Sequence, residues 1–174
     1  MRLFIALEFP SAIIDYLGSI QCDLRTHHFF DGRYVKPEQL HSTLAFFSGC
    51  SQNDVEKFIQ QLEALTVLPF EVTLGSLDVD DVSKPRVVWV NLVSDHLTKT
   101  AHVFRKGNEK PFRPHGTLAR IKKVYNKQGL LDYVEQYTVQ PHSFMVDALV
   151  LKRSQLTRTG PTYETLFTRT LSSL

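Results

Sequence analysis

The stretches Leu40–Phe47 (LHSTLAFF) and Pro114–Lys123 (PHGTLARIKK) carry the same pattern, His-x-Thr-Leu, at residues 41–44 and 115–118. The two copies start 74 residues apart (115 − 41 = 74), which is close to half of the 174-residue chain. A bare His-x-Thr triplet arises by chance in a chain of this composition, whereas two copies of the full tetrapeptide are expected in about a few chains per thousand. The repeat therefore predicts two related units that face each other.

The residues around both copies are typical of β-strands. Side chains two apart in a strand lie on one face, about 6.6–6.8 Å from each other along the chain. We therefore expect His41 and Thr43 to project together into a cleft, and His115 and Thr117 to do the same, while their neighbours face the core. A third triplet, His96–Thr98, starts a predicted helix, where the two side chains point in different directions, and we expect no role for it.

Hydrophobic periodicity supplies the other elements. We predict strands over residues 2–8, 40–47, 69–80, 86–93, 113–122, 144–156 and 162–171, with a short one inside 31–39. We predict helices over residues 11–27, 51–65, 94–107 and 127–137, capped by Ser11, by Ser51 and by Ser94 or Asp95, with Gly107 ending the third. This order predicts an α+β fold in a single domain spanning residues 1–174. It is bilobal, with two pseudo-symmetric antiparallel sheets, helices on their outer faces and a central cleft.

Composition and charge favour a globular protein and argue against a secreted or membrane-spanning one. The chain is 43% hydrophobic and 22% charged, as in ordinary globular proteins, and its net charge of +2 suits an anionic substrate better than a surface that coats nucleic acid. The apolar run Leu3–Leu7 is too short for a signal peptide, and none approaches the roughly 20 residues of a membrane span. Cys22 and Cys50 show no disulfide or metal spacing. We therefore expect a cytoplasmic protein that contacts no membrane.

Two imidazoles and two hydroxyls in one cleft suit the cleavage of a phosphodiester by water. One imidazole would take the proton of water and the other would protonate the leaving oxygen, and both roles are open near neutral pH. The hydroxyls of Thr43 and Thr117 would hold the phosphate oxygens, with the guanidinium of Arg120 as a helper or a surface group. A cyclic phosphate is strained, so we expect no metal and no cofactor. The pseudo-symmetry leaves open which of His41 and His115 is the acid.

Several residues near the motifs have structural as well as functional interpretations. Tyr163 and Ser154 would either line the cleft or pack within the fold, whereas Lys152 and Arg153 are expected in solvent.

The aromatic residues and the remaining histidines also have either a structural or a functional interpretation. Phe46, Phe47 and Phe112 are candidates for stacking on bases, while Trp89 is expected in the core. The remaining histidines show no metal-ligand spacing and are expected at the surface or at helix caps; they are His27, His28, His96, His102 and His142.

Five blocks of the chain resemble the RNA 2′,3′-cyclic phosphodiesterases of bacteria and archaea. These enzymes were first called 2′-5′ RNA ligases and belong to the two-histidine phosphoesterase superfamily. The blocks run in order along the chain: MRLFIALEFP (1–10), VKPEQLHSTLAFF (35–47), PRVVWV (85–90), FRPHGTLARIK (112–122) and LVLKRSQLTRTGPTYETL (149–166). The two HxTx motifs mark the superfamily, and the flanking blocks point to this branch.

The resemblance implies a substrate, a product and a role for each site residue. It implies hydrolysis of RNA ending in a 2′,3′-cyclic phosphate to a 2′-phosphate, with weak reverse joining of tRNA halves through a 2′-5′ bond. By this resemblance His41 is the proton donor and His115 the proton acceptor, while Thr43, Thr117 and Arg120 bind the phosphate. A monomer is expected, because one chain completes the cleft.

Three alternatives remain beside this interpretation. The same chemistry could act on a small substrate such as a 2′-5′ oligoadenylate, an ADP-ribose cyclic phosphate or another cyclic nucleotide. The chain could be a non-catalytic module that binds RNA ends, or a metallohydrolase built on its histidines. One departure from the family bears on the choice, because the segment Ser94–Lys110 is shorter than in many relatives, which alters the expected RNA-binding rim.

Overall fold

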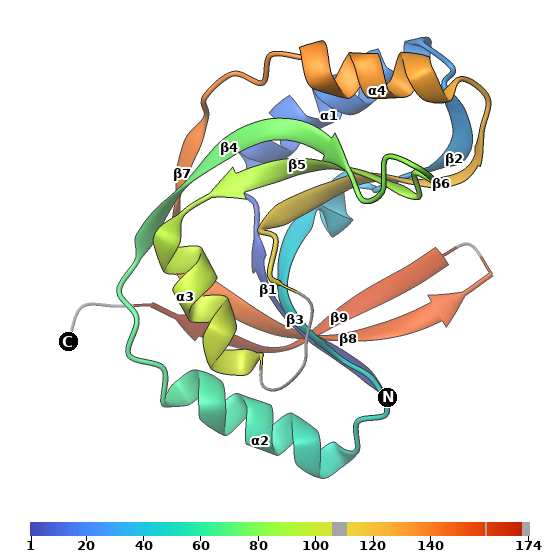
Figure 1. The fold of residues 1–174 in the computed structure, drawn as a ribbon. Coiled ribbons are helices and arrows are strands. Elements are labelled where there is room, and N and C mark those ends of the chain that lie inside the picture. The colour runs from blue at the N-terminus through green and yellow to red at the C-terminus, as the bar shows by residue number, and fades with distance from the viewer. Residues whose placement is uncertain (106–110, 159, 172–174) are drawn as a thin grey trace.

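Two antiparallel sheets form the frame of the molecule in the computed structural model, which describes residues 1–105, 111–158 and 160–171 (Figure 1). The first sheet has the strand order β3-β1-β8-β9 and the second has the order β2-β6-β5-β4-β7. The strands are β1 (Arg2–Glu8), β2 (Phe30–Tyr34), β3 (His41–Phe47), β4 (Phe70–Val79), β5 (Val87–Val93), β6 (His115–Val124), β7 (Ser143–Val146), β8 (Ala148–Thr157) and β9 (Gly160–Thr170). The helices are α1 (Ser11–Thr26), α2 (Gln52–Glu63), α3 (Asp95–Phe104) and α4 (Lys127–Gln136), with a 3₁₀ turn, η1, at Pro37–Gln39. The predicted α+β class with two antiparallel sheets is confirmed.

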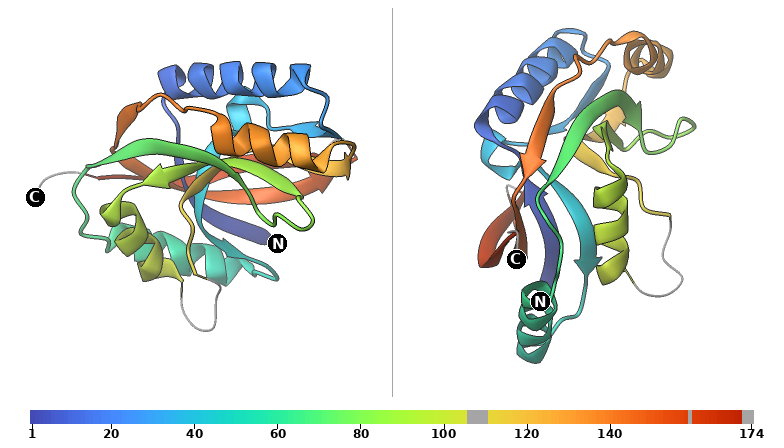
Figure 2. Two further views of the ribbon diagram at one scale, coloured as in Figure 1. Left: turned by 45° about the horizontal axis from the view of Figure 1, so that its top comes forward. Right: turned by 90° about the vertical axis from the view of Figure 1, so that its left-hand side faces the viewer.

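The helices cover the sheets as their apolar faces require. Helices α1 and α4 lie together over the five-stranded sheet, and α2 packs against β8 and β9 (Figure 2). Helix α3 differs from the prediction, because it contacts β3 of one sheet and β4 of the other and so ties the lobes together. None of the described helices is long and apolar enough to cross a bilayer.

The two lobes exchange strands rather than dividing the chain at its middle. Strand β2, from the first half, pairs with β6 in the five-stranded sheet. Strands β8 and β9, from the last third, extend the four-stranded sheet beside β1. Each lobe therefore depends on both halves of the chain, and the sites on β3 and β6 are held by pairing between distant segments.

Strand β1 has two apolar faces that serve different purposes. Leu3, Ile5 and Leu7 are fully buried in the main core, which runs through both lobes. Phe4 and Ala6, on the opposite face, form a small separate cluster with Val150 beneath the ring of Tyr163. Phe4 of this second cluster lies against the rings of both His41 and Tyr163, which belong to the site described below.

Several sequence expectations about the ends of elements are corrected or confirmed by the structure. The predicted strand 144–156 is in fact two strands, because the chain leaves the five-stranded sheet after β7 and enters the four-stranded sheet at β8, with Asp147 between them. Ser11 does not cap α1, since Pro10 occupies the N-cap position and no side chain bonds there. Ser51 and Ser94 are confirmed as caps of α2 and α3. Helix α3 ends at Phe104, and Gly107 lies outside the described residues.

Candidate active site

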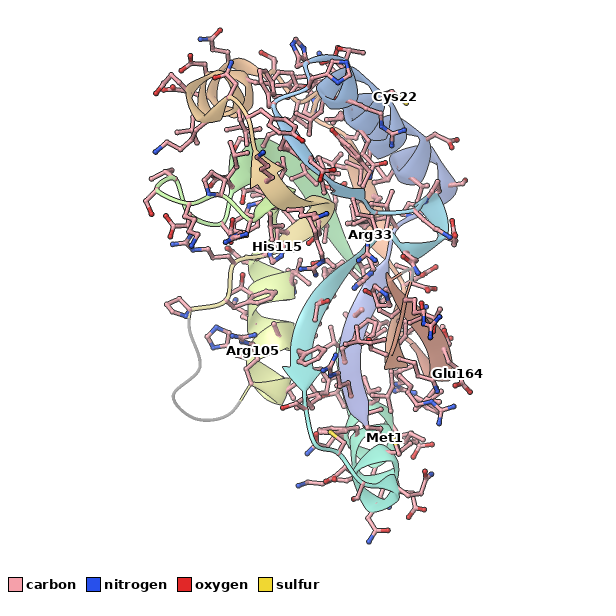
Figure 3. The ribbon with its side chains drawn as sticks, turned by 90° about the vertical axis from the view of Figure 1, so that its right-hand side faces the viewer. Met1, Cys22, Arg33, Arg105, His115 and Glu164 are labelled. Carbon is pink, nitrogen blue, oxygen red and sulfur yellow. The ribbon has the colours of Figure 1, made fainter. Side chains whose placement is uncertain are left out.

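Strands β3 and β6 contact each other across the two sheets and bring the two motifs into one cavity of about 100 Å³. Figure 3 views the molecule from this side and labels His115 together with Arg33 and Arg105. The lining residues are Arg33, Val35, Gln39, His41, Thr43, His115, Thr117, Arg120, Pro161 and Tyr163. All five predicted site residues therefore lie around one space, although they come from different sheets.

The Leu of each motif is the extra residue of a β-bulge. In β3 the partners of Ile5 and Ala6 on β1 are Ala45 and Thr43, so Leu44 is unpaired. In β6 the partners of Val88 and Trp89 on β5 are Ala119 and Thr117, which leaves Leu118 unpaired in the same way. A bulge bends its strand and redirects the side chains before it, as is common beside active sites. The bulge therefore falls at the same position in both His-x-Thr-Leu motifs, directly after the threonine.

Side chains from outside the strands bond to both bulged residues. The buried Gln21 on α1 donates its Nε2 hydrogens to the carbonyls of Leu118 and Val35, each at 2.8 Å. On the other strand, Arg105 Nη1 donates to the carbonyl of Leu44 at 3.4 Å. These two side chains were not singled out by the sequence, because nothing in the local pattern connects them with motifs 97 and 61 residues away.

Both imidazoles are oriented by the same backbone contact. Nδ1 of His41 lies 2.6 Å from the carbonyl oxygen of Gln39, and Nδ1 of His115 lies 2.6 Å from that of Arg113. A carbonyl oxygen can only accept, so Nδ1 carries the hydrogen in each ring and Nε2 of the neutral form holds the free lone pair. The structure thus leaves Nε2 of each histidine to exchange protons with a ligand.

His41 is the more enclosed of the two histidines. Its ring lies between Phe4, at 5.1 Å, and the edge-on ring of Tyr163, at 5.3 Å between centroids. The hydroxyl of Thr43 lies 3.0 Å from Nε2 and donates to it in the neutral tautomer. Tyr163 is therefore a wall of the site, which decides between its two sequence interpretations.

Burial lowers the pKa of both histidines below the ordinary value of 6.5. For His41 the backbone contact to Gln39 opposes this shift, while the positive charge of Lys152 adds to it. For His115 the contact to Arg113 opposes the shift and the charge of Arg120 adds to it. Without a ligand both imidazoles are therefore mainly neutral at pH 7.

A wider hollow of about 590 Å³ opens beside the cavity at the two motifs and shares Thr43 and His115 with it. Trp89 is buried, as the sequence predicted, but its ring also lines this hollow and lies tilted against His115, with 4.6 Å between ring centroids. Phe46, which is 53% exposed, and Phe112 also line it, as the sequence predicted. Phe47 does not, because it stacks on Phe58 of α2 at 4.1 Å.

The structure places three consecutive residues of β8 differently from the sequence expectations: Lys152, Arg153 and Ser154. Lys152 is not in solvent: its side chain is 11% exposed and forms an ion pair with Glu8. Arg153 is half-buried and pairs with Glu164 across the β8–β9 ladder. Ser154 lies at a separate surface hollow beside Met1, away from the cleft.

The second residue of each motif provides a test of the packing beneath the site. Ser42 is fully buried and its hydroxyl finds no hydrogen-bond partner in the described part of the chain, whereas a Cβ on Gly116 would lie 2.8 Å from the ring of Phe9. We expect Ser42→Ala to raise the free energy of unfolding by about 1 kcal/mol, since it removes an unsatisfied polar group. We expect Gly116→Ala to lower it by about 1–3 kcal/mol through overpacking. Urea denaturation of both variants tests this, and a larger loss in Ser42→Ala than in Gly116→Ala would contradict it.

Metal-ligating groups do not gather anywhere in residues 1–105, 111–158 and 160–171, where no three His, Cys, Asp or Glu side chains could share an ion. None of the other five histidines lines the cavity at the two motifs. His96 sits on α3, so the third His-x-Thr triplet is helical as predicted.

Comparisons with known proteins agree with the geometry. A family model described as the 2′-5′ RNA ligase superfamily matches residues 9–158. An Aquifex aeolicus protein named RNA 2′,3′-cyclic phosphodiesterase is 31% identical over 148 residues, which cover 76% of this chain and 78% of the relative. A Thermus thermophilus crystal structure superposes with a TM-score of 0.82 at 26% identity, covering 98% of both chains. Escherichia coli LigT in complex with 3′-AMP gives a TM-score of 0.74 at 27% identity, over 99% of this chain and 98% of LigT.

Proposed function

Because the chain belongs to the 2′-5′ RNA ligase superfamily, we propose that it is an RNA 2′,3′-cyclic phosphodiesterase that hydrolyses the cyclic end to a 2′-phosphate. The observation that carries the proposal is that both HxTx motifs present a histidine and a threonine to the cavity of about 100 Å³, which we now call the catalytic cavity. The name of the Aquifex relative and the 3′-AMP complex of LigT support the same class of substrate.

The proposed reaction uses His115 as base and His41 as acid. Nε2 of His115 takes a proton from water, and the water oxygen attacks phosphorus. The bond from phosphorus to O3′ breaks on the opposite side, and O3′ takes the proton from Nε2 of His41. The family resemblance makes this assignment, and the less enclosed position of His115 suits the residue that must receive water.

Three further groups would hold the phosphate in place. Thr43 and Thr117 would donate their hydroxyl hydrogens to the non-bridging oxygens, and Arg120 at the edge of the cavity would supply positive charge. These donors and the imidazolium take the charge that develops on the phosphoryl group, so the proposal assigns no metal and no cofactor. With water replaced by a 5′-hydroxyl, the same residues would run the reaction backwards as weak 2′-5′ ligation.

The first test is hydrolysis of a short RNA ending in a 2′,3′-cyclic phosphate in the presence of EDTA. We expect turnover to persist and the product to be a 2′-phosphate, because the acid stands on the side of O3′. Resolving 2′- and 3′-phosphate products by chromatography measures both points. A 3′-phosphate product would mean that O2′ rather than O3′ is the leaving oxygen and would contradict the proposal, and loss of turnover in EDTA would favour a metallohydrolase.

The pH dependence of the reaction follows from the lowered pKa values. The free enzyme must hold one protonated and one neutral histidine, so kcat/KM should fall as pH rises through the higher of two pKa values that lie below 6.5. A bound phosphate carries negative charge and favours the imidazolium, so the falling limb of kcat should lie at higher pH. Profiles of kcat and kcat/KM between pH 4 and 9 measure this (roughly the range in which imidazole titrates). Falling limbs at the same pH would contradict it.

A second candidate is the same chemistry on a small cyclic nucleotide. The aromatic hollow formed by Trp89, Phe46 and Phe112 beside the cavity could hold one nucleoside without further RNA. Comparing kcat/KM for nucleoside 2′,3′-cyclic phosphates, 2′-5′ oligoadenylate and RNA ends distinguishes the two candidate functions.

We further propose that the chain acts as a single domain and as a cytoplasmic monomer, since one chain supplies both motifs.

A further inference from the structure

A third hollow, of about 480 Å³, continues the cleft on the side away from the aromatic residues. It is formed by β2, β6 and the turn of the β8–β9 hairpin, and its lining residues are Asp31, Gly32, Arg33, Arg120, Ile121, Lys122, Thr157, Arg158 and Gly160. It shares Arg33 and Arg120 with the catalytic cavity, so the two spaces adjoin at these side chains. We call this the basic groove.

Charge is distributed unevenly along the cleft. The basic groove holds four cationic side chains, on Arg33, Arg120, Lys122 and Arg158, and one acidic side chain, Asp31. Its local charge is therefore about +3 (4 − 1 = 3), larger than the net charge of +2 of the whole chain.

The opposite end of the cleft has a different character. The aromatic hollow contains two acidic side chains, Asp80 and Asp81, and two arginines, Arg105 and Arg113, so its charges cancel. A phosphodiester backbone carries one negative charge per nucleotide and is drawn to the groove end, whereas a base is better placed on the aromatic end.

The hairpin forms one wall of the basic groove and is held against the other lobe. Gly160 has a φ of +126° and lies so close to the Arg33 guanidinium that a Cβ there would clash with it. The side-chain amide of Gln39 donates to the carbonyl of Pro161 at 2.8 Å. These contacts set the hairpin turn, with Arg158, across from Lys122 on β6.

We propose that the basic groove binds the phosphodiester backbone on the 5′ side of the cyclic end, and so makes RNA oligonucleotides better substrates than nucleoside cyclic phosphates. The inference rests on the proposed function, because the position of the cyclic phosphate at His41 and His115 fixes where the chain must go. With that phosphate in the catalytic cavity and the terminal base in the aromatic hollow, the continuous route for the remaining strand passes Arg120 into the groove.

Charge reversal in the groove tests the proposal without touching the catalytic cavity. Lys122 and Arg158 line the groove but not the cavity, and both are exposed. For the double variant Lys122→Glu/Arg158→Glu, we expect kcat/KM on an RNA octamer with a cyclic end to fall at least about tenfold. We expect kcat/KM on the matching nucleoside 2′,3′-cyclic phosphate to stay unchanged. The slope of log(1/KM) for the octamer against log salt should shrink by about 1.4, or 0.7 per lost phosphate contact.

A matched control has the same change of charge elsewhere. Lys57 on α2 and Lys99 on α3 are exposed and line neither the cavity nor the groove, so Lys57→Glu/Lys99→Glu should leave both substrates unaffected. Equal losses in the two double variants, or equal losses on the two substrates, would overturn the proposal.

Failure of the proposed function would be seen separately, as a wild-type chain that turns over neither substrate. In that case, fluorescence anisotropy with a labelled single-stranded RNA octamer ending in a 2′-phosphate still tests the groove. Weaker binding by the groove variant than by the control variant supports the proposal, and equal binding by both overturns it.

Discussion

Replacing His115 with alanine is expected to lower kcat on RNA with a 2′,3′-cyclic phosphate end by about 10²–10⁴-fold. In the proposed mechanism Nε2 of His115 is the base that takes the proton of water, since Nδ1 is already bonded to the carbonyl of Arg113. His41→Ala is expected to cost a similar factor through loss of the acid. Because both proton transfers serve one displacement, the double variant should be about as slow as the slower single variant.

Single-turnover rates with the octamer in EDTA measure this, with thermal unfolding as a check that each variant is folded. His96→Ala is the matched control, because His96 heads the third His-x-Thr triplet but lies exposed on α3, outside the catalytic cavity. Its rate should equal that of the wild type. A non-catalytic RNA-end binder would show no wild-type turnover to lose, and single histidine variants that keep most of the wild-type rate would exclude the two-histidine mechanism.

The repeated tetrapeptide predicted the centre of the molecule because its information is local. Period-two alternation places His41 and Thr43 on one face and buries Ser42 and Leu44 on the other, and the structure has this pattern in both strands. The repeat also predicted that the two motifs meet. Each strand supplies one histidine, whereas acid–base cleavage of a phosphodiester needs two. The two antiparallel sheets could likewise be predicted from the repeat together with the order of strands and helices along the chain.

What the sequence did not predict is set by contacts between distant segments. The crossing of the chain from β7 to β8 at Asp147 leaves the apolar pattern uninterrupted, so the residues on both sides resemble one strand. Lys152 was expected in solvent because lysine usually is, but its partner Glu8 lies on the neighbouring strand β1 and keeps the pair beside His41. The role of Trp89 beside His115 depends on the pairing of β5 with β6, which no local pattern specifies.

Removing the hydroxyl of Thr43 or Thr117 is expected to have the second-largest effect on catalysis. Thr43→Val and Thr117→Val keep the size and branching of the side chain but delete the hydroxyl that, in the proposed mechanism, donates to the phosphate oxygens. Loss of one donor to a developing negative charge typically costs about 10²–10³ in kcat, or about 2.7–4 kcal/mol of transition-state stabilisation. Thr43→Ser and Thr117→Ser retain the hydroxyl and should recover most of the rate, which separates loss of the donor from loss of packing.

The two valine variants should differ in their pH dependence, although their motifs are nearly symmetric. In the free enzyme the Thr43 hydroxyl donates to Nε2 of His41, and this bond favours the neutral imidazole. Its removal should raise the pKa of His41, so the falling limb of kcat/KM should move to higher pH in Thr43→Val. Thr117 has no such bond to His115 among the hydrogen bonds of the described residues, so Thr117→Val should lower the rate without moving that limb.

Parallel pH profiles of kcat/KM for the two variants measure the difference. Identical shifts would mean that the Thr43–His41 contact does not control the protonation of the acid, and that the two halves of the site are electrostatically equivalent.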